Sequence, residues 1–247
     1  MKAVILAGGK GTRLNLQDLP KPMAPFLGKP LLEHIINFLK SFGIRDIILC
    51  TGYMSDKIEE YFGDGREFGV NISYSVETEP LGTGGALKNI ADMIDSTFIL
   101  VNGDCLMDID INSLMDFHKA NDAVVSAALT PCNNPLQQEL VLLDKERVVK
   151  FLPRNSKEHR EMLSKEGNKF INAGIYVFEP EVFRYAPEEN SFALEKDWFN
   201  LLLGEGKKFV GYYEPGCYIE IGNPKLYEEA QQNLSVKNFI GGLNGQD

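Results

Sequence analysis

The chain has 247 residues, and its 35 acidic against 25 basic side chains give a formal net charge of −10. This balance disfavours binding to nucleic acid, because a phosphate backbone needs a basic excess to neutralise it. With 44% hydrophobic and 24% charged residues, the composition is that of a globular protein with a sizeable core, and it excludes a disordered or fibrous chain.

Neither a membrane segment nor a cysteine motif is predicted. No apolar run of the sequence approaches the ~20 residues that span a bilayer, and the run Ala3–Ala7 is shorter than the ~7–15-residue core of a signal peptide. We therefore expect a cytoplasmic protein without membrane contact. The four cysteines lie far apart and none forms a C-x-x-C pair, which argues against a zinc site or a redox motif.

Strands and helices alternate through the first hundred residues. Short apolar runs rich in Val and Ile predict strands over 1–7, 46–50, 71–76 and 97–101. Apolar residues at helical spacing predict helices over 30–43, 55–62 and 85–94. Ser55 is the expected N-cap of the second helix. This order predicts an α/β fold with a doubly wound, mostly parallel (Rossmann-like) sheet and helices on both faces.

Beyond residue 104 strands outnumber helices. We expect strands over 123–129, 140–143, 148–151 and 170–178 and around Val210 and Tyr218. Helices are expected over 112–121, 194–203 and 225–234, and the polar segment 155–167 is a solvated helix or a loop. Because no linker is evident, we expect one domain over residues 1–235 with two lobes divided near residue 130. A flexible tail is expected over 236–247.

A glycine-rich turn follows the first strand, in Leu6-Ala7-Gly8-Gly9-Lys10-Gly11-Thr12-Arg13. Ligands of open parallel sheets bind outside the carboxyl ends of the strands. Three glycines in four positions let the backbone approach an anion and turn its N–H groups inward, which predicts a phosphate cradle. The spacing matches neither the dinucleotide fingerprint nor the Walker motif, which argues against hydride transfer and P-loop ATPase chemistry. A tight strand-to-helix corner is the alternative interpretation.

A lysine between two prolines follows this turn, in Pro20-Lys21-Pro22. Each proline fixes its own φ and restricts the residue before it, so Lys21 is expected on a stiff arm. A preorganised cation beside a phosphate cradle stabilises charge on a transferred phosphate. Taken alone, Lys21 would also fit a solvated loop.

These motifs resemble those of the sugar-1-phosphate nucleotidylyltransferases. The resemblance rests on Leu6–Leu14, Pro20–Met23 and Gly28–Pro30, and it continues through Glu79–Ala86, Asn102–Asp104, Asn172–Gly174 and Glu220–Gly222. The stretch Gly82–Ala86 is most similar to the branch of heptose- and mannose-1-phosphate guanylyltransferases, and it also resembles glucose-1-phosphate cytidylyltransferase.

The resemblance implies an EC 2.7.7 enzyme that joins a nucleoside triphosphate to a sugar 1-phosphate and releases pyrophosphate, in nucleotide-sugar and polysaccharide biosynthesis. A phosphate monoester has a second pKa of ~6 and is largely dianionic at neutral pH, so this nucleophile needs no protein base. Positioning and charge neutralisation then supply the catalysis. The resemblance further implies a nucleotide-binding core over about 1–130 and a smaller acceptor-binding α+β lobe over about 131–235.

Catalytic, nucleotide-binding and metal-binding residues follow from the same resemblance. The implied catalytic residues are Arg13, Lys21 and Asp104, which also contact the nucleotide. The other implied nucleotide contacts are Leu6, Ala7, Gly8, Gly9, Gly11, Thr12, Glu77, Pro80, Gly82, Thr83 and Gly103. The implied cofactor is Mg²⁺, which prefers carboxylate, water and phosphate oxygens. Its expected ligands are Asp104 and Glu220, the latter in place of the family's usual Asp.

Glu77 occupies the position that reads the base in this family. A carboxylate accepts hydrogen bonds and does not donate them, so it suits the adjacent N1–H and N2–H₂ donors of guanine and suits the edge of cytosine poorly. GTP is therefore the expected donor. Two alternatives stay open: an exposed strand glutamate, and uracil, whose single N–H would also satisfy the carboxylate.

The expected acceptor site departs from the family pattern. Phe151-Leu152-Pro153-Arg154 replaces the usual Phe-x-Glu-Lys, and Arg154 keeps a cation that suits a bidentate grip on phosphate. Glu139 stands where a glycine is usual. Asn172 and Glu195 are the expected contacts of acceptor hydroxyls. These departures leave the acceptor open, a phosphate without a sugar included.

Other functions remain alternatives. A cytidylyl- or uridylyltransferase would use the same fold. A glycosyltransferase would use a D-x-D metal motif, which Asp108-Ile109-Asp110 matches. The changes at Glu139, Pro153 and Glu220 would also fit a non-catalytic sensor of nucleotide sugars. The oligomeric state stays open, with a homo-oligomer among the alternatives.

Overall fold

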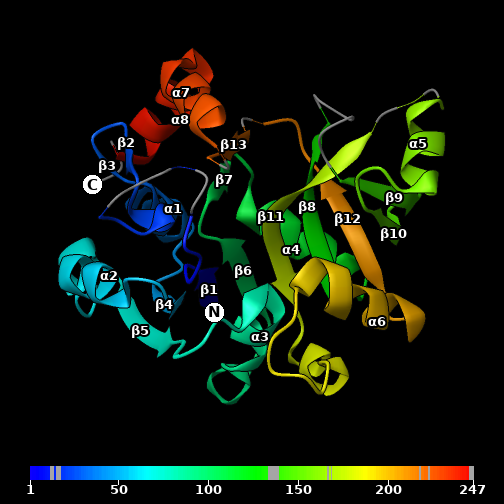
Figure 1. The fold of residues 1–247 in the computed structure, drawn as a ribbon, viewed down its shortest axis with the longest axis horizontal. Coiled ribbons are helices and arrows are strands. Elements are labelled where there is room, and N and C mark those ends of the chain that lie inside the picture. The colour runs from blue at the N-terminus through cyan, green and yellow to red at the C-terminus, as the bar shows by residue number, and fades with distance from the viewer. Residues whose placement is uncertain are drawn as a thin grey trace.

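The structure, a computed structural model, describes residues 1–11, 14, 18–132, 139–165, 167, 169–216, 218–221 and 223–244. Within them, nine strands form one sheet in the order β5-β4-β1-β6-β11-β8-β12-β10-β9 (Figure 1). The first four of these strands are mutually parallel. They are β5 (Asn71–Val76), β4 (Asp46–Thr51), β1 (Lys2–Leu6) and β6 (Phe98–Asn102).

The second half of the sheet is mixed. Strand β11 (Phe170–Phe178) runs antiparallel to β6 and to β8 (Val125–Pro131), whereas β12 (Phe209–Tyr213) is parallel to β8. The hairpin of β9 (Leu140–Asp144) and β10 (Arg147–Leu152) follows. Phe170 of β11 also pairs with Val141 of β9, so this half closes on itself. The sheet as a whole is therefore mixed, and parallel pairing prevails only in its first four strands.

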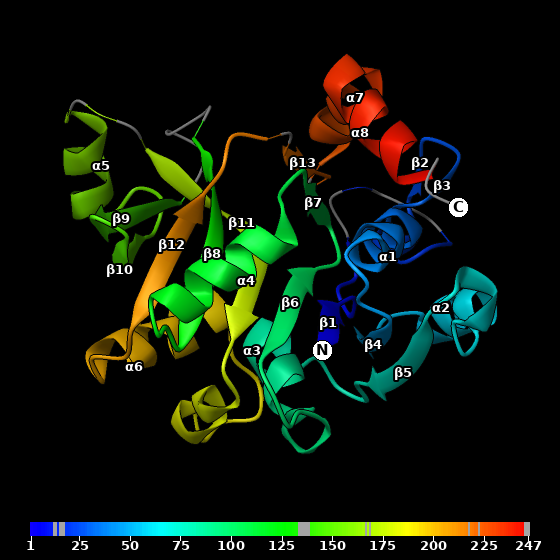
Figure 2. The ribbon, with the colours of Figure 1, turned by 180° about the vertical axis from the view of Figure 1, so that it is seen from behind.

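Helices cover both sides of the sheet and create two apolar cores. The core on one side holds Ala3 and Ile5 of β1 with buried residues of α1, α2, α4 and α8. The other core holds Val4 of β1 with buried residues of α3 and α6. Helices α3 and α6 lie in front of the sheet in Figure 1, and α4 lies in front of it in Figure 2. This division follows from the two-residue alternation of a strand that is buried on both faces.

The helices and short strands complete the fold. The α-helices are α1 (Leu31–Ser41), α2 (Ser55–Phe62), α3 (Gly82–Lys88), α4 (Ile111–Ala120), α5 (Lys157–Leu163), α6 (Phe199–Gly204), α7 (Pro224–Gln232) and α8 (Leu234–Asn244). A π-helix, η6 (Leu194–Trp198), precedes α6, and the 3₁₀ helices are η2 (Lys21–Met23), η3 (Arg66–Phe68), η4 (Ala91–Met93) and η5 (Pro180–Tyr185). Two small sheets pair β2 (Pro25–Phe26) with β3 (Lys29–Pro30) and β7 (Cys105–Met107) with β13 (Tyr218–Glu220). Among the described residues, no helix is long and apolar enough to cross a bilayer.

Two helix boundaries differ from the sequence prediction. Ser55 is the first residue of α2 and does not cap it, because Met54 precedes it in the left-handed conformation with φ of 53°. Helix α3 begins at Gly82, three residues before the expected start. It ends at Lys88, before the 3₁₀ helix η4. The first turns of α3 contain Gly82, Gly84 and Gly85, which pack so closely against Asn190 and Phe192 that a Cβ would clash there. This packing, which apolar periodicity does not reveal, accounts for the earlier start.

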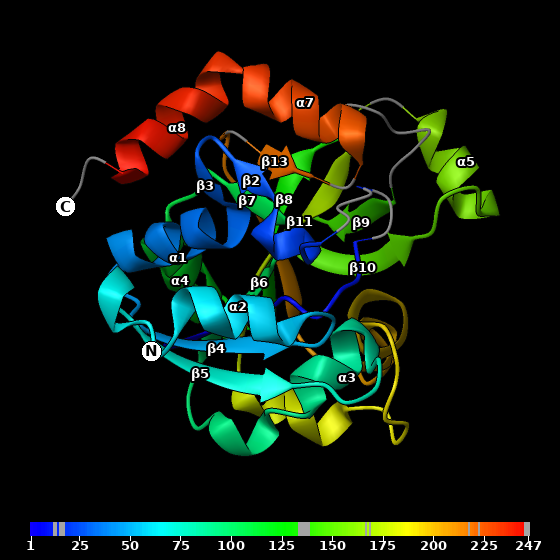
Figure 3. The same ribbon diagram turned by 60° about the vertical axis from the view of Figure 1, so that its left-hand side comes forward.

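The C-terminal segment is helical where a flexible tail was expected. Over residues 236–244 the chain belongs to α8, which buries Val236 and Ile240 in the core that also holds α1. Figure 3 shows α7 and α8 running above α1 and the β2–β3 hairpin. The apolar face of α8 gains burial that outweighs the weak helix propensity of Gly241 and Gly242. Residues 245–247 lie outside the described residues.

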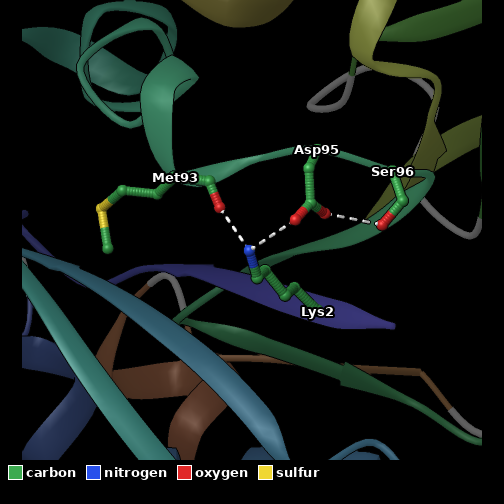
Figure 4. Close-up of polar contacts among 4 residues, drawn as sticks. All are labelled: Lys2, Met93, Asp95 and Ser96. Carbon is green, nitrogen blue, oxygen red and sulfur yellow. Dashed lines mark hydrogen bonds and ion pairs between the residues drawn. The ribbon is translucent and has the colours of Figure 1, made fainter.

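The amino end of β1 is tied to the turn that follows α3. Lys2 Nζ donates to the carbonyl oxygen of Met93 at 2.7 Å and lies 3.5 Å from Asp95 Oδ2 (Figure 4). The Ser96 hydroxyl and then the Lys2 ammonium hold the pKa of Asp95 below its ordinary value. This exposed contact fixes the end of β1 opposite to the glycine-rich turn.

Two histidines are buried as neutral groups. His118 of α4 lies 2.8 Å from Ser126 Oγ and 3.2 Å from Glu179 Oε1, and His34 Nε2 lies 2.7 Å from the carbonyl oxygen of Phe26. Burial lowers the pKa of both histidines below the ordinary value, and the neighbouring acceptors offset only part of that effect.

We predict that acidification destabilises the fold through these two groups. The unfolded chain takes up protons at both histidines near pH 6.5, whereas the native state holds them neutral to lower pH. Stability is therefore full above about pH 6.5 and falls as the pH drops below it. Urea unfolding between pH 8 and pH 5 measures this, and the slope should shrink in His118→Gln. An equal slope in the variant would contradict the assignment to His118.

Candidate active site

A cavity of about 610 Å³ opens at the carboxyl ends of β1, β4, β5 and β6. This is the place where open parallel sheets bind their ligands. Ten of the residues that the sequence analysis selected line it, and they come from four separate segments. They are Leu6, Gly8, Gly9, Lys21, Glu77, Pro80, Gly82, Thr83, Gly103 and Asp104.

The glycines of this cavity allow close approach of backbone and side chains. A Cβ at Gly8 would lie 2.8 Å from Glu77 Oε1, and a Cβ at Gly103 would lie 2.6 Å from the carbonyl oxygen of Leu6. Gly11 has a positive φ of 60° and packs against the Lys21 side chain. Any other residue at these positions would push the wall of the cavity outward.

Two predicted nucleotide contacts, Ala7 and Gly11, are not among the described residues that line the cavity. Ala7 is buried and donates its N–H to the Cys50 carbonyl oxygen at 2.7 Å, so its amide serves the sheet rather than the cavity. Thr12 and Arg13 lie outside the described residues.

Lys21 and Asp104 form an ion pair at the wall of the cavity. Lys21 begins η2 directly after Pro20, whose φ is −70°, and is only 8% exposed. Its Nζ donates to Asp104 Oδ2, and 38% of the Asp104 side chain remains exposed. The Pro-Lys-Pro motif thus delivers a buried ammonium from the loop after β1 to a carboxylate at the end of β6.

The Glu220 backbone lies beside that of Asp104. Strand β13 pairs antiparallel with β7, with Glu220 opposite Cys105. The Ile221 N–H also donates to the Asp104 carbonyl oxygen at 3.2 Å. The described residues contain no cluster of three or more His, Cys, Asp or Glu side chains that would hold a metal ion without a ligand's help.

Glu77 lies directly after β5 and lines the cavity. Its N–H donates to the Thr51 carbonyl oxygen at 2.8 Å, and its Oε2 accepts from the Leu81 N–H at 3.0 Å. Burial raises the pKa of Glu77, which the Leu81 hydrogen bond partly offsets. The carboxylate is therefore fixed in direction, with Oε1 packed against Gly8.

Two predicted acceptor residues are joined by a buried tyrosine. Tyr176 Oη donates to Glu195 Oε1 at 3.0 Å and accepts from Asn172 Nδ2. Asn172 Oδ1 in turn accepts from the Gly174 N–H at 3.0 Å. Burial raises the pKa of Glu195, and the charges of Glu139 and Asp104 raise it further. The Glu195 carboxylate is thus held by the buried Tyr176 hydroxyl.

The other two predicted acceptor residues are exposed. Glu139 lies immediately before β9, close enough to influence Glu195. Arg154 lies in the turn after β10 and is not among the described residues that line the cavity. The structure thus joins Asn172 and Glu195 through Tyr176, whereas no described hydrogen bond links Glu139 or Arg154 to them.

Some lining residues were missed by the sequence analysis. Lys10 and Tyr53 both line the cavity, with Lys10 Nζ 6.0 Å from the centre of the Tyr53 ring. Tyr53 follows the predicted strand 46–50, so its place at a carboxyl end was the available signal. Tyr176 shares one face of β11 with Asn172, as residues four apart on a strand do, which was the signal for their contact.

The D-x-D motif has another use in this structure. Asp110 caps α4, because its Oδ1 accepts from the Asn112 N–H at 2.9 Å and its Oδ2 from the Ser113 hydroxyl at 2.8 Å. Asp108 is exposed, and burial and the charge of Glu214 raise its pKa. Because Asp110 serves as a helix N-cap, the D-x-D match no longer supports a glycosyltransferase.

The sequence and fold match known proteins over nearly the whole chain. Residues 2–237 match the family described as Nucleotidyl transferase. The chain is 36% identical to D-glycero-alpha-D-manno-heptose 1-phosphate guanylyltransferase of Aneurinibacillus thermoaerophilus, over 95% of this chain and 98% of that protein. It is 37% identical to mannose-1-phosphate guanylyltransferase of Mycobacterium tuberculosis, over 94% of this chain but 64% of that protein. HddC from Yersinia pseudotuberculosis, crystallised with GMP-PN, superposes with a TM-score of 0.77 at 27% identity, over 96% of this chain and 99% of that chain.

A mixed α/β sheet with a cavity at the carboxyl ends of its parallel strands, lined by glycines and by the Lys21–Asp104 pair, suits a phosphorylated ligand. With the family match over residues 2–237, the chain belongs to the nucleotidyl transferase family and is a nucleotidyltransferase.

We predict that Gly8→Ala impairs nucleotide binding without unfolding the protein. The added methyl group would meet Glu77 Oε1 at 2.8 Å and would displace that carboxylate. The dissociation constant of a nonhydrolysable GTP analogue should rise at least ~10-fold, about 1.4 kcal/mol. Calorimetric titration measures this, with Gly204→Ala as control, since nothing lies within 4 Å of a Cβ there. Unchanged affinity in a folded Gly8→Ala protein would contradict the close packing.

Proposed function

We propose that the protein transfers the guanylyl group of GTP to a sugar 1-phosphate of heptose or mannose type, giving an NDP-sugar and pyrophosphate. The observation that carries this proposal is the convergence of the glycine turn, Glu77 and the Lys21–Asp104 pair on one cavity. The names of the heptose and mannose relatives, at 36% and 37% identity, support the choice of acceptor.

The reaction uses the acceptor's own charge. A phosphate oxygen of the sugar 1-phosphate attacks the α-phosphorus of GTP, a new P–O bond forms, and the bond to the leaving pyrophosphate breaks. No protein base is needed, because the attacking phosphate is already largely dianionic at neutral pH. Lys21 stabilises the charge that develops on the transferred phosphorus group, since its ammonium is buried and held in place. The family resemblance assigns Arg13 and Thr12 to the same triphosphate.

Mg²⁺ fits the donor set at the end of β6. Asp104 offers a partly exposed carboxylate, and Glu220, whose backbone pairs with that of Cys105, is the second proposed ligand. Oxygen ligands completed by phosphate and water are those that Mg²⁺ prefers. When bound, the ion neutralises phosphate charge and orients the triphosphate.

The two lobes divide the substrates between them. Residues of about 1–130, with the doubly wound half of the sheet, hold the nucleotide. Residues of about 131–235 hold the acceptor. Asn172 and Glu195 bind its hydroxyl groups, and Glu139 and Arg154 make further contacts. Uridylyl transfer is the second candidate, because the Glu77 carboxylate would also accept from the single N–H of uracil.

The function is tested by pyrophosphate release in the presence of Mg²⁺. Each of GTP, UTP, CTP and ATP is combined with mannose 1-phosphate, heptose 1-phosphates, glucose 1-phosphate and phosphates without a sugar. We expect the highest kcat/KM for GTP with heptose 1-phosphate or mannose 1-phosphate. Tight binding of a nucleotide sugar without turnover would instead identify a sensor.

We predict that Lys21→Ala lowers kcat by at least ~10²-fold, the scale for loss of one preorganised charge-stabilising group. Asp104→Asn should cause a similar loss. The exposed Lys57→Ala is the matched control and should retain the wild-type rate, since Lys57 lies in α2 outside the described cavity lining. Near-normal turnover in folded Lys21→Ala would remove Lys21 from the mechanism.

We predict that Glu77→Gln weakens the preference for guanine. Glutamine donates as well as accepts, so it satisfies the paired donors of guanine poorly and tolerates other bases. The ratio of kcat/KM for GTP to that for UTP should fall at least ~10-fold, the equivalent of about 1.4 kcal/mol. An unchanged ratio would show that another group reads the base.

A further inference from the structure

The carboxyl end of α3 fixes the start of segment 187–194. Lys88, the last residue of the helix, donates from Nζ to three successive carbonyl oxygens, at 2.6, 3.0 and 3.1 Å. These carbonyls belong to Pro187, Glu188 and Glu189. One ammonium has three protons, so the whole donor capacity of Lys88 is spent on holding this segment.

The amino end of α3 fixes the rest of the same segment. Phe192 forms backbone hydrogen bonds with Leu81 and with Gly84, each of 3.0 Å. The Leu194 N–H donates to the Thr83 hydroxyl at 2.8 Å. Since Thr83 also lines the nucleotide cavity, one hydroxyl group connects that cavity with the residue next to Glu195.

We propose that Lys88 and Thr83 are positioning residues that set the place of Glu195 for the acceptor. This inference rests on the proposed function. Glu195 is the second residue of the π-helix η6, directly after Leu194, and its carboxylate accepts from Tyr176 Oη at 3.0 Å. Helix α3 thereby serves both substrates: its first turn lines the nucleotide cavity, and its side chains hold the segment that presents the acceptor's carboxylate.

The test compares Lys88→Met, Thr83→Val and Thr83→Ser in steady-state assays with GTP and the sugar 1-phosphate that wild type uses best. Loss of a positioning hydrogen bond should raise the KM for the sugar phosphate by about 3- to 30-fold. In Lys88→Met, whose residue lies outside the described cavity lining, the kcat at saturation and the KM for GTP should stay within about 2-fold, as expected when only acceptor binding is lost. Thr83→Val also alters the wall of the nucleotide cavity, so it is judged by the KM for the sugar phosphate alone. Thr83→Ser keeps the hydroxyl group and should resemble wild type. Lys207→Met, which removes a lysine that contacts Glu181 and Tyr185, is the matched control.

A double-mutant cycle separates positioning from general loosening. In a Glu195→Ala background, Lys88→Met and Thr83→Val should raise the KM for the sugar phosphate no further, because the group that they position is gone. The same fold-increase with and without Glu195 would overturn the inference.

The remaining outcomes are also decisive. Unchanged KM for the sugar phosphate in folded Lys88→Met and Thr83→Val, or an equal rise of both KM values in Lys88→Met, overturns the inference while the proposed function stands. Wild-type protein that releases no pyrophosphate from GTP with any sugar 1-phosphate overturns the proposed function, and the inference with it.

Discussion

The placement of β1 between β4 and β6 is the constraint on which the site depends. Its five residues pair in parallel with β4 and four of them pair in parallel with β6, so all three strands end at the same edge of the sheet. The glycine turn, Tyr53 and Asp104 are thereby brought together although they lie far apart in the sequence. Ala3 and Ile5 face one apolar core and Val4 the other, so a shift by one residue would exchange the faces of β1. Burial on both sides thus fixes the register, and the register fixes the cavity.

The net charge of the protein is negative, so the binding of an anionic nucleotide depends on the groups that line the cavity. The chain carries a net charge of −10, yet the cavity is walled by glycine backbone and by a buried lysine. Net charge acts over long distances and is screened within about 8–10 Å at physiological salt, whereas a fixed ammonium acts at contact in a medium of lower dielectric constant. Asp104 holds Lys21 in place and compensates its charge.

The first half of the fold was predictable from the sequence because its signals are local. Apolar runs, the glycine turn and the Pro-Lys-Pro motif each occupy a few consecutive residues. Because the carboxyl ends of parallel strands share one edge of the sheet, motifs that follow predicted strands are expected to lie together. The closure of β11 onto β9 joins Phe170 to Val141, a long-range pairing that no local pattern specifies. Asp108-Ile109-Asp110 shows the same limit, because a metal motif and a helix N-cap share the same letters. Helix α8 was missed because its glycines argue against a helix, although Val236, Phe239 and Ile240 have helical spacing. Their burial in the core, which the sequence does not show, stabilises the helix.

The distribution of charge across the two lobes orients the proposed acceptor. Lys21 stands at the nucleotide side, whereas Glu195 and Glu139 influence each other on the acceptor side. A sugar phosphate has an anionic end and a neutral end that carries hydroxyl donors. Its phosphate is repelled by the carboxylates and attracted to the ammonium, while its hydroxyl groups are good donors to carboxylate oxygens. In the proposed reaction the phosphate oxygen therefore points toward the triphosphate that it attacks, and we expect the same carboxylates to disfavour a reversed acceptor.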